Sequence, residues 1–381
     1  MKQHKILFVD HTAVMGGAEL SLLDLATTYA ATSKVLLFQD GVLRDRLERS
    51  GVQVKIAPAS KTMLNLRTSG GLSALATIPE LWNLAGYIAQ EAKDCDLILA
   101  NSQKAFVTAA LSSLRNSPPV LWHLRDILTA KHFSQVNRMV AIFLANQFAA
   151  KVLVNSQATG KAFVAAGGKP QLTRVVYNGF DSQKFDMVDY EDVAKIRSQL
   201  GIGNVPLVGL FSRLSYWKGQ HIILKAIKQL PTVHLILVGE ALFGEQEYVS
   251  ELKALAGTPE LKGRVHWLGF RDDVPTLMKA CDIIVHTSTE PEPFGRVIVE
   301  GQLAQKPVIA SAAGGALELI EDGKNGYLFP PGDINALSQL IQKLIADGTL
   351  AKTLGQQGYV DAQQNFSLET ILDSFEQALS N

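Results

Sequence analysis

The stretch CDIIVHTSTEPEPFGRVIVE, residues 281–300, contains a short apolar strand, a loop and the beginning of a helix. Residues 283–286 form an apolar run of strand length, and Pro293 and Gly295 shape a tight turn after it. Apolar strands of this length that alternate with amphipathic helices are typical of a parallel sheet covered on both faces. The stretch therefore predicts one strand–loop–helix unit of an α/β fold.

The same alternation continues in both directions and is interrupted once. A polar, charged stretch over residues 182–204 separates two sets of strands. The predicted strands are 5–9, 34–39, 97–100, 120–123 and 152–154 before this stretch, and 207–211, 234–238, 265–268, 283–286 and 308–310 after it. We therefore predict two Rossmann-like domains, residues 1–182 and 205–365, and expect a C-terminal helix over 366–381 to pack back on the first.

Length and composition agree with two domains of this kind. The 381 residues are 47% hydrophobic and 19% charged, which is enough to bury two sizeable cores. A formal net charge of zero gives no global attraction to nucleic acid, so local sites must select the substrate. Cys95 and Cys281 each precede an apolar strand and no CxxC pair exists, so we expect buried, reduced thiols.

The apolar runs of the chain are short. Residues 6–9 are too few for a signal-peptide core, and residues 139–145 are too few to span a bilayer. We therefore expect a soluble, cytoplasmic protein without a transmembrane segment. The sequence leaves a peripheral contact with a membrane surface open.

Two glutamates frame the turn that follows strand 283–286. Ligands of open parallel sheets bind at the carboxyl ends of the strands, and Glu292 and Glu300 are separated there by seven residues. A carboxylate accepts hydrogen bonds from two adjacent sugar hydroxyls, and the first N–H groups of a helix offer donors to an anion or a hydroxyl. Two carboxylates on one turn–helix unit are suited to two parts of a bipartite ligand. For either glutamate alone, a capped helix with a solvated acid is the alternative.

A second loop, residues 211–219, carries two cations between a strand and a helix. Arg213 can grip phosphate oxygens in a bidentate manner, and Lys218 acts as a compact charge. Positive charge beside a departing nucleoside diphosphate stabilises the negative charge that develops on it. This loop therefore predicts a diphosphate site, with a solvated basic loop as the alternative for the segment taken alone.

Together these features resemble the large retaining glycosyltransferase family 4, whose E-x7-E signature Glu292 and Glu300 match. The similar segments extend over nearly the whole chain: GGAE at 16–19, WHLR at 122–125, NS at 155–156, YNGFD at 177–181, SRL at 212–214, KG at 218–219, GE at 239–240, GF at 269–270 and GG at 314–315. The resemblance, which includes glycogen synthase and sucrose-phosphate synthase, implies the GT-B fold with two Rossmann-like domains facing each other across a cleft. It also implies a metal-independent hexosyltransferase that retains the anomeric configuration, by front-face attack of the acceptor as the diphosphate leaves.

The resemblance assigns roles in the second domain. Arg213 and Lys218 would bind the diphosphate, Glu300 the ribose hydroxyls and Glu292 the hydroxyls of the transferred sugar. Backbone amides at 294–295 would support the sugar or phosphate, and the base would rest near 269–271. The expected residues for binding the sugar donor are Gly17, Arg213, Lys218, Gly239, Phe270, Glu292, Phe294, Gly295, Arg296 and Glu300, and those for catalysis are His123, Arg213, Lys218 and Glu292. For Arg296, a phosphate contact and the capping of surface acids both remain open.

The first domain is expected to hold the acceptor. Gly16 and Gly17 allow the backbone to approach a ligand at the start of a helix. Arg67 and Arg125, with Lys61 and Lys131, would meet a phosphorylated acceptor or an anionic lipid head group, or serve as ordinary surface charge. His123 ends a strand, where it either lines the reaction centre, as the family resemblance implies, or is a packed core residue.

We predict no metal and no cofactor, because Arg213, Lys218 and helix N-termini can neutralise a diphosphate. A UDP-sugar is the favoured donor, and a polysaccharide, a lipid-linked sugar or a small sugar is the expected acceptor, with no nucleic-acid partner. Transfer from UDP-glucose to a phosphorylated sugar, a GDP-mannose-dependent mannosyltransferase and an inactive GT-B scaffold remain alternatives. A nicotinamide enzyme is disfavoured, because no G-x-G-x-x-G follows the first strand.

Overall fold

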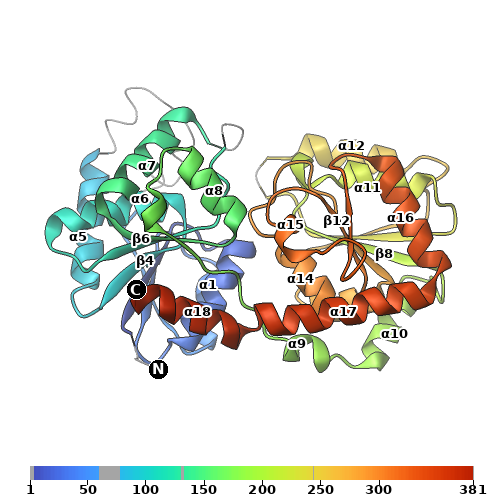
Figure 1. Ribbon diagram of the computed structural model, residues 1–381, viewed down its shortest axis with the longest axis horizontal. Coiled ribbons are helices and arrows are strands. Elements are labelled where there is room, and N and C mark those ends of the chain that lie inside the picture. Colours follow the sequence, from blue (N-terminus) through green and yellow to red (C-terminus); the bar gives the residue numbers. More distant parts are fainter. Residues whose placement is uncertain (1–3, 60–77, 130–132, 243, 381) are drawn as a thin grey trace. The chain divides into compact units, whose positions relative to one another are not determined.

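The computed structural model describes residues 4–59, 78–129, 133–242 and 244–380. Its internal contacts divide the chain into two compact units, Met1–Gly179 with Ile371–Asn381 and Phe180–Thr370. Each unit is a parallel sheet with helices on both faces (Figure 1). The predicted α/β class is therefore confirmed.

The sheet of the first unit has the strand order β3-β2-β1-β4-β5-β6-β7 within the described ranges, and all neighbouring strands are parallel. The strands are β1 (Ile6–Asp10), β2 (Lys34–Leu37), β3 (Gln53–Ile56), β4 (Leu97–Ala100), β5 (Val120–Leu124), β6 (Ala149–Val154) and β7 (Thr173–Val175). Strands β1, β4 and β5 are buried along their whole length, as expected for a sheet covered on both faces.

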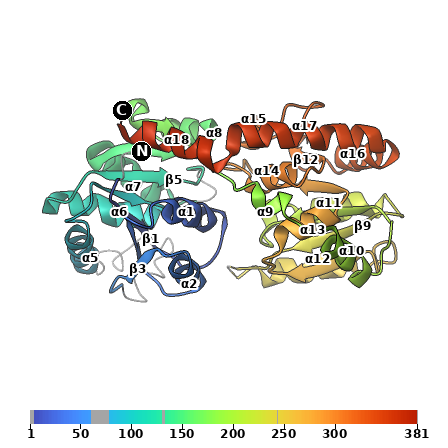
Figure 2. The same cartoon turned by 90° about the horizontal axis from the view of Figure 1, so that it is seen from below.

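Helices of the first unit form a layer on each side of this sheet. The helices are α1 (Gly17–Thr28), α2 (Val42–Arg49), α5 (Ile78–Glu91), α6 (Gln103–Ser112), α7 (Gln135–Phe148), α8 (Gln157–Ala165) and α18 (Leu368–Ser380). Figure 2 shows α5 and α6 on one side of strands β1 and β3 and α1 and α2 on the other. One core contains Phe106 of α6 stacked on Trp122 of β5, with ring centroids 4.4 Å apart. The other core takes Phe375 from α18, whose ring meets the edge of Tyr29 at 5.9 Å.

The second unit repeats this architecture with the strand order β10-β9-β8-β11-β12-β13. The strands are β8 (Leu207–Phe211), β9 (His234–Val238), β10 (Val265–Gly269), β11 (Ile283–His286), β12 (Val308–Ser311) and β13 (Tyr327–Phe329). The helices are α9 (Gln183–Asp186), α10 (Tyr190–Gln199), α11 (Gln220–Lys228), α12 (Gln246–Ala256), α13 (Val274–Ala280), α14 (Arg296–Leu303), α15 (Ala316–Leu319), α16 (Ile334–Ala346) and α17 (Gly348–Phe366). The strands predicted at 207–211, 234–238 and 283–286 are confirmed.

The stretch 182–204, expected as the boundary between domains, is itself structured. It holds α9 and α10 and belongs to the second unit, because Arg197 of α10 donates to the carbonyl oxygen of Ala280 at 2.6 Å and lies 3.4 Å from Asp282. The chain divides instead at Gly179 and again within α18, after Thr370. A helix with a polar outer face has the composition of a linker, which explains the difference.

Candidate functional site

The two loops singled out in the second unit leave neighbouring strands at the same edge of the sheet. Strand β8 pairs with β11, and the strand order reverses between them, because β9 and β10 lie on one side and β12 and β13 on the other. Open α/β sheets bind ligands at the carboxyl ends of the strands at such a reversal. Arg213 and Lys218 follow β8, and Glu292 and Glu300 follow β11.

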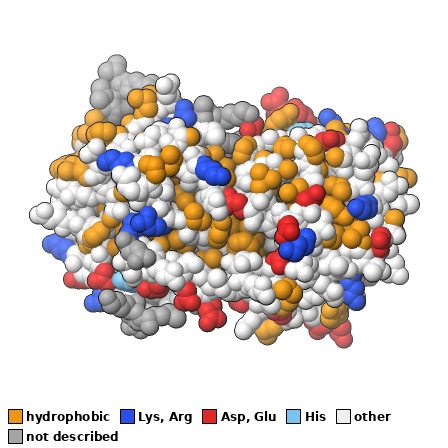
Figure 3. Space-filling model, in the orientation of Figure 1, with side chains coloured by type: hydrophobic (Ala, Val, Ile, Leu, Met, Phe, Trp, Pro, Cys, Tyr) orange, Lys and Arg blue, Asp and Glu red, His pale blue; other side chains and the backbone are white. Residues whose placement is uncertain are grey.

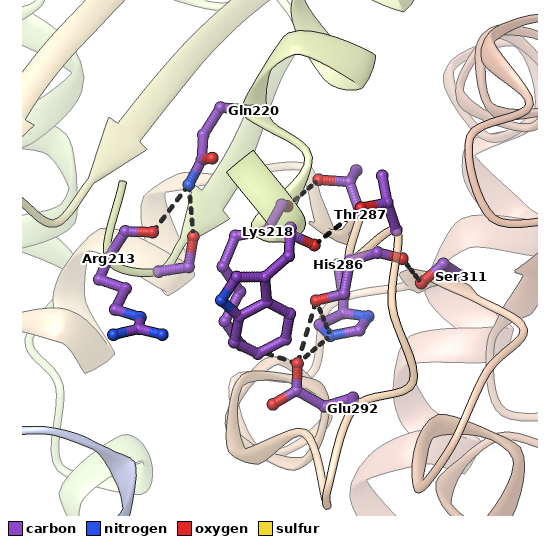
Figure 4. A network of polar contacts seen from close by, with 11 residues as sticks. Arg213, Lys218, Gln220, His286, Thr287, Glu292 and Ser311 are labelled. Carbon is purple, nitrogen blue, oxygen red and sulfur yellow. Dashed lines mark hydrogen bonds and ion pairs between the residues drawn. The ribbon is translucent and has the colours of Figure 1, made fainter. Parts of the chain in front are cut away.

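Lys218 and Glu292 join the two loops through an ion pair of 2.7 Å between Nζ and Oε2, and their side chains are only 16% and 12% exposed. The same carboxylate oxygen lies 3.1 Å from Nε2 of His286 and accepts a hydrogen bond of 3.0 Å from Oγ of Ser288. Figure 4 shows Lys218 and His286 converging on Glu292. One oxygen of Glu292 is thus fixed by three groups, and its other oxygen takes part in none of these contacts.

The charges of this cluster support one another. Burial alone would raise the pKa of Glu292, but the charge of Lys218 and the contact with His286 outweigh it and hold this pKa below its usual range. Burial lowers the pKa of Lys218, while Glu292 opposes that shift and Arg213 adds to it. Glu292 is therefore an ionised hydrogen-bond acceptor, and Lys218 is the nearest countercharge.

The loop after β8 is held tightly against the loop after β11. Gly219 has φ 72°, and a Cβ atom there would lie 2.0 Å from the carbonyl oxygen of Thr287. The hydroxyl of Thr287 donates to the carbonyl oxygen of Lys218 at 2.8 Å (Figure 4). Nζ of Lys218 lies 4.0 Å from the ring centroid of Trp217, and Cζ of Arg213 lies 5.7 Å from the same centroid. A left-handed glycine and one aromatic ring therefore position both cations.

The turn after Glu292 orients Arg296 and Glu300. Gly295 has φ 100° and precedes α14, in which Arg296 Nε donates to Glu300 Oε1 at 3.3 Å. The Arg296 guanidinium also lies 4.4 Å from the ring centroid of Phe180. Of the two roles left open for Arg296, the structure shows the pairing with an acid. Phe294, expected to offer its backbone amide, is buried.

The region expected to read the base lies at the ends of β9 and β10. Gly239 has φ 132° and donates its N–H to the carbonyl oxygen of Gly269 at 2.8 Å. The N–H of Phe270 donates to Oε1 of Glu240 at 3.2 Å, while the Phe270 side chain is exposed. These backbone donors therefore already have partners, and Glu240 is the carboxylate that fixes the loop.

The first unit places a second polar cluster at its own reversal of strand order, between β1 and β4. Asn101 donates to Asp10 at 2.6 Å and accepts from Arg125 Nε at 2.7 Å. Arg125 also donates to Asn178 at 2.6 Å and lies 3.1 Å from Nδ1 of His123. Arg125 is only 7% exposed, so of the roles left open for it, that of an ordinary surface charge is wrong.

This cluster fixes the proton of His123. A guanidinium has no acceptor, so Nδ1 of His123 must accept from Arg125 and the neutral ring carries its hydrogen on Nε2. Burial, followed by the charge of Arg125, lowers the pKa of His123 well below its usual value. Nε2 is buried and has no hydrogen-bond partner in the described part of the chain. The ring thus presents a neutral N–H donor.

Gly16 and Gly17 lie at the beginning of α1, whose first turn contains Glu19. A Cβ atom on Gly16 would lie 2.7 Å from Oε2 of Glu19, so a larger residue there would require the Glu19 side chain to move. Burial and then the charge of Asp10 raise the pKa of Glu19 to about 8, while Arg125 opposes the shift. Glu19 is therefore largely protonated at neutral pH. Arg67, with Lys61 and Lys131, lies outside the described residues.

Comparison with known proteins assigns this architecture. Residues 192–361 match the model of glycosyl transferases group 1, and residues 16–179 match the glycosyl transferase 4-like domain. HepE of Anabaena, solved in complex with UDP and glucose, is 46% identical over 99% of this chain and 100% of that chain, with a TM-score of 0.90. The chain belongs to the group 1 glycosyltransferases. The family and the GT-B fold implied by the sequence resemblance are confirmed.

Two further proteins are similar to this glycosyltransferase, one in part of its sequence and one in its fold. The lipopolysaccharide core biosynthesis glycosyltransferase LpsE of Rhizobium meliloti is 32% identical over 178 residues, which are 47% of this chain and 51% of LpsE. The match thus spans about half the length of that curated relative. Sucrose-phosphate synthase of Thermosynechococcus elongatus, at 22% identity and a TM-score of 0.81, has the same fold.

Some polar residues of the glycosyltransferase were not singled out from the sequence. One group lies at the end of β11, where His286 is the last residue of the strand and Thr287 and Ser288 follow it. Their contacts with the loop after β8 and with Glu292 are evident only once β8 is paired with β11. Asp10 and Asn101 end two strands that are distant in sequence. The sequence signal that could have identified these residues is the presence of polar side chains directly at the ends of predicted apolar strands.

The described residues of the glycosyltransferase contain neither a candidate metal site nor a candidate membrane-spanning helix. Over these ranges, no three His, Cys, Asp or Glu side chains gather in a way that could hold a metal ion. None of the helices there combines the length and the apolar character needed to cross a membrane.

Proposed function

We propose that this glycosyltransferase takes its sugar from a UDP-sugar, with UDP-glucose as the leading donor. The observation that carries the proposal is the pairing of Lys218 with Glu292 between two loops at the reversal of strand order in the second unit. HepE of Anabaena, which matches 99% of this chain at 46% identity, was also solved in complex with UDP-glucose. This likeness favours UDP over GDP as the leaving group.

In this proposal, the diphosphate competes with Glu292 for Lys218. Arg213 and Lys218 flank Trp217, and positive charge aimed at the departing diphosphate would stabilise it without a metal ion. Glu292, released from Lys218 but still held by His286 and Ser288, would accept hydrogen bonds from hydroxyls of the transferred sugar. Glu300 would turn from Arg296 to the ribose hydroxyls.

The first unit would supply the acceptor side of the reaction. His123 offers a neutral Nε2–H that a sugar hydroxyl can accept, and Arg125 fixes the ring in that tautomer. Retention would follow from front-face attack, because Glu292, which stays hydrogen-bonded to His286 and Ser288 and turns to the sugar hydroxyls, is a poor nucleophile. A polysaccharide, a lipid-linked sugar or a small sugar is the proposed acceptor.

The test is release of UDP from UDP-glucose by purified protein, with GDP-mannose as the competing donor and with chelator in parallel reactions. The proposal predicts turnover with UDP-glucose, a much lower rate with GDP-mannose, and no loss on chelation. The anomeric configuration of the product, read by NMR, tests retention. Turnover with GDP-mannose alone would overturn the choice of donor.

A further inference from the structure

Helix α5 of the first unit borders a hollow in the surface of the protein. The hollow has a volume of about 680 Å³, within the range of about 300–1,000 Å³ that is typical of small-molecule sites. Asn83, Tyr87 and Gln90 line it from one face of α5, because they are spaced four and three residues apart. Arg115, the last residue of the short 3-10 helix η1 (Ser113–Arg115), lines it from α6. The left end of the first unit in Figure 3, where Figure 1 places α5, is mainly white, the colour of uncharged polar side chains and backbone.

The hydrogen-bonding capacity of this lining is unused. Over the described ranges, the three α5 side chains and Arg115 form neither a hydrogen bond nor an ion pair with the protein. Side-chain amides and the phenol both donate and accept hydrogen bonds, and the guanidinium only donates. Sugar hydroxyls also donate and accept, so this set of groups is suited to a carbohydrate.

The guanidinium of Arg115 is held in place although the residue is exposed. Its Cζ lies 4.1 Å from the ring centroid of Trp82, and a Cβ atom on Gly86 would lie 2.7 Å from its Nη1. Glycine weakens the interior of a helix, and here it leaves the space in which the guanidinium lies against α5. Asn116 follows with φ 56°, a left-handed turn that ends η1. The cation is therefore oriented before a ligand arrives.

The charges along the hollow select the kind of ligand. A planar guanidinium without a carboxylate partner is suited to a bidentate contact with an acid. Glu80, an acid of the lining, lies in the first turn of α5, about 9 Å along the helix axis from Gly86. A ligand that places a carboxylate at Arg115 and hydroxyls toward Glu80 satisfies both ends.

This hollow is separate from the polar cluster of the first unit. Arg115 precedes β5, whereas His123 and Arg125 lie at the carboxyl end of that strand, which is about 16 Å long. The residues expected to bind the sugar donor, apart from Gly17, belong to the second unit. A ligand in the hollow would therefore occupy a site of its own.

We propose that this hollow, defined by Asn83, Gly86, Tyr87, Gln90 and Arg115, binds an oligosaccharide that carries a carboxylate. The amides and the phenol would bind sugar hydroxyls, and the guanidinium would bind the carboxylate. An acidic peptide fits less well, because peptide sites rely on apolar anchors and the α5 side chains here are two amides and a phenol. The proposal is independent of the choice of sugar donor.

The experiment is saturation-transfer NMR of the full chain with trigalacturonic acid, and with the neutral trisaccharide maltotriose. Trigalacturonic acid is expected to bind at least about tenfold more tightly, as a hydrogen bond to a charged group predicts. Arg115→Ala should remove this advantage. Gly86→Ala keeps the charge but displaces the guanidinium, so affinity should fall about threefold or more. The midpoint of thermal unfolding should not fall in Gly86→Ala, because alanine favours the helix.

Matched controls test the same two kinds of substitution elsewhere. Arg49→Ala removes an exposed arginine of α2, and Gly348→Ala adds a methyl group to α17 in open space, and both should leave trisaccharide binding unchanged. UDP binding should be unchanged in every variant, which separates this test from that of the donor site. Absence of transfer to trigalacturonic acid, equal affinity for maltotriose, or wild-type affinity in Arg115→Ala would overturn the proposal. Equal binding of the peptide tetraglutamate would also overturn it, in favour of a general anion site.

Discussion

The two polar clusters of this glycosyltransferase lie at corresponding places in their sheets but are built differently. In the second unit, Lys218 and Glu292 neutralise each other, so a ligand that carries both phosphate and hydroxyls can exchange with each of them. In the first unit, Arg125 is committed to Asn101, Asn178 and His123, and all three partners come from different strand ends or loops. In the proposed function, the cluster of the second unit is an exchangeable charge pair for the sugar donor, and that of the first unit is a fixed scaffold that orients one histidine.

Loss of the exchangeable cation should have the largest effect. Lys218→Ala is expected to lower kcat with UDP-glucose by about 10²–10³-fold, because the departing diphosphate loses a charge aimed at it. Lys225→Ala, on the exposed side of α11, is the control and should leave kcat unchanged. If both variants turned over at the wild-type rate, the exchange of partners in the second unit would be refuted.

A change in the fixed scaffold around Arg125 should lower the stability of the protein. Arg125→Lys keeps the charge but removes the planar guanidinium that bonds to three acceptors at once. The free energy of unfolding should therefore fall by about 1–3 kcal/mol. Arg44→Lys, on an exposed face of α2, should leave it unchanged. Urea unfolding of the two variants checks the contrast, and equal stability would show that the first cluster is as adaptable as the second.

Sequence reasoning found the exchangeable site more completely than the fixed one. The loops with Lys218 and Glu292 are contiguous runs of unusual residues after apolar strands, so local pattern and family resemblance identified them. Arg125 was open to interpretation as surface charge, because its acceptors at Asn101 and Asn178 are remote in sequence. The segment that forms helix α10 was expected to be part of the boundary between the domains, since polar residues dominate its composition. Contacts that depend on the pairing of strands are difficult to predict from the local sequence.

A smaller effect concerns Glu19, whose pKa is raised by burial from 4.5 to about 8. The folded state then binds more protons than the unfolded state between these values, so the free energy of unfolding should fall as pH rises through this window. Glu19→Gln should flatten that dependence. Urea unfolding across the same pH range measures it, and parallel curves for wild type and variant would contradict a protonated Glu19.

The smallest expected effect is that of chelation. If Arg213, Lys218 and helix N-termini neutralise the diphosphate, EDTA should leave kcat with UDP-glucose unchanged. Turnover before and after dialysis against EDTA tests this. A loss that magnesium or manganese restores would mean that the two cations do not suffice.

Titration calorimetry of UDP binding tests the central claim most directly. Wild-type protein is predicted to bind UDP more tightly than GDP, ADP or NAD⁺, and Glu300→Ala is predicted to weaken UDP binding at least about tenfold, as expected for a lost hydrogen bond to a charged group. Glu247→Ala, an exposed acid of α12, should bind UDP as the wild type does. Unchanged UDP affinity in Glu300→Ala, or no UDP binding by the folded wild type, would contradict the account.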